Sequence, residues 1–175
     1  GAVISFLLAV SPARELRGML FWLMGDLGHA TLPVTGSIVL LAGLLLAFAI
    51  GRPLNILAHG ELTAASLGVR IQPLRRLLYV TASLLTATAV TIAGNVGFVG
   101  LVVPHMLRLQ GIRDHRILLP AAVLLGGSLL LLADTLSRTA LAPRQLPVGI
   151  LTALIGVPLF LYLLYRGRGL QGSED

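Results

Sequence analysis

Apolar stretches with few charges alternate with short polar segments along this chain. Five such stretches occur, at residues 33–50, 77–93, 98–109, 117–136 and 148–165. A helix that crosses the hydrocarbon core of a membrane needs about 20 predominantly apolar residues, a length that most of these stretches approach. The pattern therefore predicts an all-α fold: a polytopic transmembrane helical bundle with about five complete spans.

Two further helices are expected before the first of these spans. Residues 1–10 are apolar but too short to cross a membrane, so they are interpreted as the remnant of a sixth span whose beginning is missing. Residues 13–28 mix Arg14, Arg17 and other charges with apolar side chains around Trp22. Because tryptophan is enriched at the depth of the lipid headgroups, this segment predicts a short interfacial helix on the outer side.

Residues 51–76 form the longest polar-containing interval between two predicted spans. Within it, Gly60 and Gly68 bracket residues 61–67, which are good helix formers with an acidic residue in the first turn. Three residues would give this helix an apolar side: Leu62, Ala65 and Leu67. Two helical turns are only marginally stable alone in water, so the helix is expected to lie on a surface of its own chain or of a partner protein.

The stretch after residue 93 contains three glycines and a proline: Gly94, Gly97, Gly100 and Pro104. Their spacing differs from the G-x-G-x-x-G of dinucleotide-binding loops, and no predicted strand precedes them. Glycine and proline at membrane depth instead predict a short or broken helix that runs to about Leu109. The backbone groups freed by the break must be covered by protein or must line a water-filled cavity.

Composition supports a membrane protein and limits its chemistry. Hydrophobic residues make up 56% of the chain and charged residues 11%, with a mean hydropathy of +0.92, whereas soluble domains are roughly 25% charged. All 13 basic residues are arginine, so the lysine of a P-loop is absent and any nucleotide chemistry must belong to another chain. The chain also lacks cysteine, which excludes disulfides and thiolate metal sites.

The distribution of arginine predicts the orientation of the spans. If residues 1–10 point outward, the larger group on one side of the membrane comprises Arg52, Arg70, Arg75, Arg76, Arg108, Arg113, Arg116, Arg166 and Arg168. The smaller group comprises Arg14, Arg17, Arg138 and Arg144. Short loops rich in arginine stay in the cytoplasm, so the side with residues 51–76 is predicted to be cytoplasmic. Because the arginines are scattered among apolar spans, nucleic-acid binding is not expected.

Few residues suggest chemistry within the chain itself. His105, Asp114 and His115 are expected on the cytoplasmic side, but no H-E-x-x-H or similar spacing occurs, so no metal site, catalytic residue or cofactor is expected. An integral membrane enzyme using these three residues stays an alternative, as does an ion-coupled secondary transporter with broken helices. Asp134 and Arg138 share a helical face, which predicts an ion pair near the interface or a contact with a docking protein.

Several motifs occur in an order that resembles one family. They are Gly97 to His105 (G-F-V-G-L-V-V-P-H), Asp114-His115-Arg116 with Leu118-Leu119-Pro120, Leu132-Ala133-Asp134 with Arg138, and Leu146 to Ile150 (L-P-V-G-I) with Gly156-Val157-Pro158. Together they resemble the FecCD family, the membrane permeases of bacterial ABC importers for iron siderophores, haem and vitamin B12. Gln145 departs from the family, which often has glutamate at this position.

The resemblance implies partners for particular residues. Cytoplasmic ATPase subunits of the family dock on the loop that matches Gly60, Glu61, Ala64, Ala65, Ser66, Leu67 and Gly68. A periplasmic substrate-binding protein meets arginines of the permease, and Arg138 matches one such position. A second permease subunit, giving a homodimer, completes the pathway within the lipid of the membrane. Family members have about ten spans, so residues 1–175 are expected to form the C-terminal half of the transmembrane permease domain.

Residues and resemblance together predict a multi-pass permease subunit of an ABC importer in the bacterial cytoplasmic (inner) membrane. It would take up an iron–siderophore complex, haem or vitamin B12 by alternating access. A separate ATPase subunit would hydrolyse ATP, so the chain itself is not expected to be an enzyme. Residues 51–76 would be the cytoplasmic coupling loop, through which closure of the ATPase changes the balance between two conformations of the spans.

Overall fold

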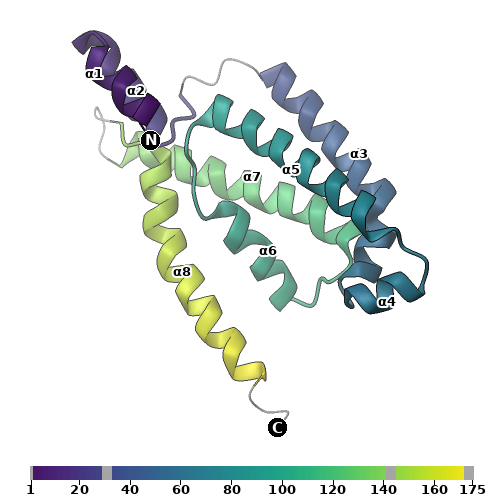
Figure 1. Cartoon of the computed structure of the whole chain (residues 1–175). Coiled ribbons are helices and arrows are strands. Elements are labelled where there is room, and N and C mark those ends of the chain that lie inside the picture. The colour runs from purple at the N-terminus through teal and green to yellow at the C-terminus, as the bar shows by residue number, and fades with distance from the viewer. Residues whose placement is uncertain (1, 29–32, 141–144, 172–175) are drawn as a thin grey trace.

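The computed structural model describes residues 2–28, 33–140 and 145–171, and every regular element within these ranges is a helix. The helices are α1 (Ala2–Val10), α2 (Ala13–Leu23), α3 (Pro33–Leu57), α4 (Glu61–Ser66), α5 (Ile71–Ala93), α6 (Val99–Leu109), α7 (His115–Thr139) and α8 (Val148–Gln171). Helix α3 packs against both α5 and α7, and α6 packs against α7 and α8 (Figure 1). The described residues therefore confirm the expected all-α fold.

Three helices of the described residues are long and apolar enough to cross a membrane, at Val34–Leu57, Ile71–Ala93 and His115–Thr139. Length and composition thus support three of the five predicted spans. Helix α6 has only 11 residues; at about 1.5 Å per residue it is about 16 Å long, roughly half the thickness of the hydrocarbon core. Residues 98–109, counted among the five spans, therefore form a half-length helix, and the prediction of a short helix that ends near Leu109 is confirmed. Helix α8 contributes a shorter apolar segment, Val148–Leu163.

The long helices extend beyond the apolar stretches that predict them. Helix α3 passes its expected end at residue 50 and continues through Pro53 to Leu57, and α5 begins at Ile71 instead of residue 77. Polar residues at either end of a span can remain helical, so hydropathy alone ends the first span too early and begins the second too late. The predicted interfacial helix at residues 13–28 is shorter than expected, because α2 ends at Leu23 and Gly25 follows with a φ of 85°.

The chain leaves helical geometry between α5 and α6. Gly94 has a φ of 71° and Phe98 a φ of 66°, and Phe98 is the single non-glycine residue of the described ranges with a positive φ. Its side chain packs on Gly156 of α8, where an added Cβ would lie 2.4 Å from the Cβ of Phe98. Added Cβ atoms on Gly97 and Gly100 would meet nothing within 4 Å. Gly94 and Phe98 therefore make the turn that precedes the short helix α6.

Three glycines meet where α2 ends, α5 ends and α8 begins. We call Gly25, Gly94 and Gly149 the glycine junction. A Cβ on Gly94 would lie 2.0 Å from the carbonyl oxygen of Trp22, and one on Gly149 would lie 2.8 Å from the carbonyl oxygen of Asn95. The amide of Gly149 donates a hydrogen bond to the carbonyl oxygen of Gly25 at 3.4 Å. The three segments consequently pack backbone against backbone at this end of the bundle.

Much of the apolar surface of the spans is left uncovered by the described residues. None of the apolar window of α5 is buried, and only 6% of that of α3 and 17% of that of α7. The buried cluster of Val103, Leu107 and Leu118 joins α6 to α7. Apolar surfaces of this extent need lipid or further protein to cover them.

Candidate functional site

Helix α4 stands at the end of the bundle where α3 ends and α5 begins (Figure 1). It lies between Gly60 and Gly68, which have positive φ angles of 109° and 77°, so the short helix predicted between these glycines is present. Leu62 is 90% exposed and Leu67 is 64% exposed. The apolar side that the sequence predicts therefore points away from the described residues and forms a free surface on α4.

The opposite side of α4 is fixed to its own chain. Ala64 is completely buried, and its carbonyl oxygen accepts a hydrogen bond from the amide of Val69 at 2.9 Å. Glu61 forms an ion pair with Arg75 of α5; because both side chains are exposed, this pair contributes only about 0–1 kcal/mol to stability. One face of α4 thus packs on its own chain. Since the Ala64 side chain is buried there, it cannot itself contact a partner as the resemblance implies.

A side-chain network joins the end of α3 to the start of α7. We call Asn55, Asp114 and His115 the inner clasp. The Asn55 amide group donates to Oδ1 of Asp114 at 2.7 Å, and Oδ1 of Asn55 accepts from the backbone N–H of His115 at 2.9 Å. The same oxygen lies 2.7 Å from Nδ1 of His115. Both ends of the Asn55 amide are therefore in use, which fixes its orientation.

Asp114 also caps helix α7. Its Oδ1 accepts from the backbone N–H of Arg116 at 2.9 Å. The hydrogen bond from the Asn55 amide, and then the one from this N–H, lower the pKa of Asp114, because both stabilise the charged carboxylate. The positive end of the α7 dipole favours the same charge. Asp114 therefore remains ionised at neutral pH and holds Asn55 through a charge-assisted hydrogen bond.

An open cleft of about 1010 Å³ lies beside the inner clasp, between the ends of α3 and α6 and the start of α7. Its polar lining consists of Asn55, His59, His105, Arg108, Arg113, Asp114 and His115. His105, Asp114 and His115, the residues of the enzyme alternative, are thus brought to one cleft. However, Asp114 and His115 are engaged by Asn55, and the described residues contain no group of three His, Cys, Asp or Glu that could hold a metal. The hydrogen-bonding groups of Asp114 and His115 are thus used to join α7 to α3.

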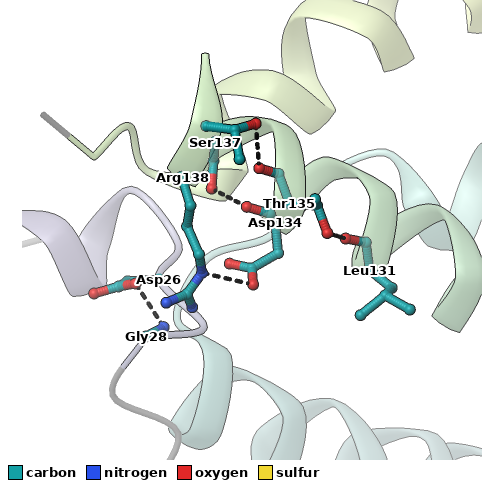
Figure 2. A network of polar contacts seen from close by, with 8 residues as sticks. Asp26, Gly28, Leu131, Asp134, Thr135, Ser137 and Arg138 are labelled. Atoms are coloured by element: carbon teal, nitrogen blue, oxygen red, sulfur yellow. Dashed lines mark hydrogen bonds and ion pairs between the residues drawn. The ribbon is translucent and has the colours of Figure 1, made fainter. Parts of the chain in front are cut away.

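At the opposite end, Asp134 and Arg138 form the ion pair that their spacing predicts. Nε of Arg138 lies 2.8 Å from Oδ2 of Asp134, and the Arg138 side chain is 41% exposed. Figure 2 shows the guanidinium beside the loop that carries Asp26 and Gly28. This loop is closed by a hydrogen bond from the Gly28 amide to Oδ1 of Asp26 at 2.8 Å. Arg138 therefore presents a cation at the surface of this end.

The position of Asp134 also bears on the secondary-transporter alternative. Such a transporter needs a polar or ionisable site near the middle of the membrane. Asp134 instead lies near the C-terminal end of α7, which ends at Thr139, and its carboxylate is paired with Arg138. The acid found within a predicted span thus belongs to the surface of one end of the bundle.

Sequence reasoning overlooked Asn55. The sequence pattern predicts a loop at this position, whereas Asn55 lies in the last turn of α3 and forms the inner clasp with residues 59 and 60 positions further along the chain. The signal available was an asparagine near a helix end together with an aspartate in a helix N-cap position, two residues with hydrogen-bonding groups that need partners. Nothing in that signal identifies them as partners of one another.

The arginines behind the predicted orientation can be followed in part. Arg75, Arg108 and Arg113 lie at the end that carries α4 and the cleft, and Arg138 lies at the other. Arg144 and the side chains of Arg166 and Arg168 fall outside the described residues. These four arginines are divided between the two ends in the way that the two groups predict.

Exposed apolar spans, a half-length helix after a glycine turn and a short helix projecting at one end define a polytopic helical membrane protein. The chain belongs to the FecCD transport family, whose model matches residues 1–166. The resemblance noted in the sequence motifs is thereby confirmed.

Curated relatives in this family carry names of transport systems. The chain is 50% identical over 172 residues to the cobalamin import system permease protein BtuC of Halobacterium salinarum, covering 94% of this chain and 44% of that protein. It is 40% identical over 169 residues to the vitamin B12 import system permease protein BtuC of Klebsiella pneumoniae, covering 96% and 51%. It is 44% identical over 174 residues to the hemin transport system permease protein HmuU of Yersinia pestis, covering 96% and 51%. The chain spans about half the length of these relatives.

A solved structure has the same fold. It is described as an inward-facing conformation of a metal-chelate type ABC transporter, and it matches with a TM-score of 0.78 and 36% sequence identity. The match covers 94% of this chain and 54% of that one.

Proposed function

We propose that this chain is the C-terminal half of a permease subunit of an ABC importer in the bacterial inner membrane. The imported substrate is an iron–siderophore complex, haem or vitamin B12, and ATP hydrolysis takes place on a separate cytoplasmic ATPase subunit. A second permease subunit and surrounding lipid cover the apolar faces of α3, α5 and α7. Family membership and the names of the relatives support this function.

The observation that carries the proposal is the exposed apolar side of α4. Leu62 and Leu67 are exposed on a helix whose other face is fixed by Ala64. A large apolar side chain in water is unfavourable, and a rigidly held one loses little conformational entropy when a partner covers it. Helix α4 is therefore the docking element for the ATPase, with Gly60, Glu61, Ala65 and Gly68 around it and the cationic cleft beside it.

At the opposite end we assign Arg138 to the docking of a periplasmic substrate-binding protein. Its guanidinium is exposed and held in place by Asp134. A carboxylate of the binding protein could add to this pair, because guanidinium has five N–H donors and Asp134 uses only part of them. Arg138 accordingly directs binding at the outer face, while α4 does so at the inner face.

Co-purification with the ATPase subunit tests this function. In the complete permease, the double variant Leu62→Ala with Leu67→Ala shortens both exposed side chains and keeps good helix formers in α4. Each leucine that a partner buries contributes about 1.5–3 kcal/mol, so captured ATPase should fall by at least about tenfold. The matched control is Thr63→Ala with Ser66→Ala, two substitutions on the same helix that remove no large apolar group. Equal capture by both double variants would contradict the docking role of α4.

A further inference from the structure

The inner clasp lies at the place where movement of α4 must be passed on to the rest of the bundle. Helix α4 packs on the ends of α3 and α5, and Asp114 and His115 of the clasp begin α7, against which α6 packs. The last residues of α3 lead directly through Gly60 into α4. A displacement of α4 would therefore act directly on the end of α3 and on the start of α5.

Helix α3 has a weak point just before this contact. Pro53 lies inside the helix and has no N–H, so the carbonyl oxygen of Ala49 loses its helical hydrogen-bond donor. The residues after Pro53 can therefore bend relative to the span more easily than an uninterrupted helix could. Without a tie beyond the proline, force applied at α4 would bend α3 there and would not reach α7.

The clasp supplies that tie. Asn55 lies two residues after Pro53, and it is bound to Asp114 at 2.7 Å and to the N–H of His115 at 2.9 Å. One turn earlier the helices are already close, since a Cβ on Gly51 would lie 2.6 Å from Cγ of Arg116. Oδ1 of Asp114 also caps the first turn of α7. The chain of contacts from α4 to α7 is thus continuous through one amide group.

We infer that Asn55 is a positioning residue that couples α4 to α6 and α7, so that ATPase movement opens or closes the pathway instead of bending α3. This inference rests on the proposed function. The amide is suited to the role because it is both donor and acceptor: its NH₂ faces a carboxylate and its oxygen faces N–H groups. A carboxylate at this position meets only half of these requirements, and an apolar side chain meets neither.

Exchange of the two polar groups provides the sharpest test. Asn55→Asp places a carboxylate against that of Asp114, and the resulting repulsion should open the clasp. The double variant Asn55→Asp with Asp114→Asn exchanges the two groups. The amide, now at position 114, donates to the carboxylate at position 55 and still caps α7. The carboxylate at position 55 still accepts from the N–H of His115. Asp114→Asn alone keeps an amide–amide hydrogen bond and should be mild. Gln110→Glu, an exposed amide-to-acid change at the same end of the bundle, is the control.

The measurement is substrate transported per ATP hydrolysed by the complete importer in proteoliposomes. For Asn55→Asp we expect ATPase capture to persist and this ratio to fall by at least about tenfold, since lost charge-assisted hydrogen bonds typically have effects of this size. The double variant should recover to within about threefold of the unmodified protein, and Gln110→Glu should not differ from it. An unchanged ratio in Asn55→Asp, or no recovery in a folded double variant, would overturn the inference.

A distance measurement separates this inference from the proposed function. Residues 1–175 have no cysteine, so in a permease whose other cysteines are replaced, spin labels at Thr63→Cys on α4 and Ile117→Cys on α7 report their separation without ATPase. The distribution should be narrow with Asn55, broad with Asn55→Ala, which removes the clasp without adding charge, and equally broad with Asn55→Asp. Equal widths of the distance distribution in the unmodified permease and in Asn55→Ala would refute the clasp. If the unmodified permease captures no ATPase, the proposed function fails, while the label distances still decide the clasp.

Discussion

The two ends of this helix bundle are joined by different kinds of contact. At the glycine junction, the ends of α2 and α5 and the start of α8 touch through backbone atoms, and a Cβ on Gly94 would lie 2.0 Å from a carbonyl oxygen. At the inner clasp, α3 and α7 are joined by the side chains of Asn55 and Asp114. A backbone contact separates only when whole segments move. A side-chain hydrogen bond can break when a single torsion angle changes, so the inner end is the more adaptable of the two.

The largest expected effect comes from adding one methyl group to the glycine junction. Gly94→Ala combines a positive φ, which costs about 1–2 kcal/mol, with overpacking against backbone, which costs about 1–3 kcal/mol. We expect a loss of about 3 kcal/mol or more and poor accumulation in the membrane. Thermal unfolding of the purified protein in detergent measures the change.

Gly97→Ala is the matched control for that substitution. Gly97 belongs to the same run of glycines, but an added Cβ meets nothing within 4 Å. Its effect should stay within about 0.5 kcal/mol. If the two variants had equal stability, the close backbone contact at Gly94 would not be what holds this end together.

A smaller effect is expected for the same change at the inner end. Gly60→Ala also forces a side chain into a positive φ, here 109°, but nothing lies within 4 Å of the added Cβ. The cost is therefore conformational alone, about 1–3 kcal/mol, and should appear as local loosening of α4. Limited proteolysis should cut near residue 60 faster, with the unfolding temperature of the bundle nearly unchanged. Global unfolding comparable to that of Gly94→Ala would remove the distinction between the two ends.

The two ends differ in how much of their structure could be predicted from the sequence. Leu62 and Leu67 between two glycines were enough to predict α4, because helix propensity and glycine turns are local properties. Gly94 was recognised as part of a break, but its contact with Trp22 depends on how α2 returns to the end of α5, which no local pattern encodes. Asn55 was missed since its partners are about 60 residues away. The short helix α6 could be predicted from Gly94, Gly97, Gly100 and Pro104, because glycine and proline interrupt a helix locally.

A third prediction concerns the cation exposed at the outer end. Arg138→Gln and Asp134→Asn each break the same ion pair, so both should lower stability by less than about 1 kcal/mol. The two variants should change capture of the binding protein in opposite directions. Removing the cation should weaken capture of the binding protein about tenfold, while removing Asp134 takes away one of the acidic groups that compete with a partner carboxylate for the guanidinium and should strengthen it. Capture by immobilised permease measures both. Weakening in both variants would indicate that the ion pair itself, and not its cation, is recognised.

The smallest expected effect is the pH dependence of the inner clasp. The pKa of Asp114 is lowered from its ordinary value of 3.8, chiefly by the Asn55 amide. A carboxyl whose folded pKa is depressed contributes stability that is fully present above its unfolded pKa. That contribution is lost as pH falls through the folded pKa. The stability difference between the unmodified protein and Asp114→Asn should therefore stay constant between about pH 8 and about pH 5, and shrink only below about pH 4.

The glycine junction provides the contrast for this measurement. It contains no titratable group, so the deficit of a destabilised junction variant such as Gly149→Ala should not change over the same pH range. Unfolding temperatures of both variants, measured in one detergent at matched ionic strength, give the comparison. A difference for Asp114→Asn that already changes between about pH 5 and about pH 8 would mean that Asp114 titrates in that range. Its hydrogen bonds to Asn55 and to the N–H of Arg116 would then be too weak to keep the carboxylate charged, and the clasp would not be a permanent contact at neutral pH.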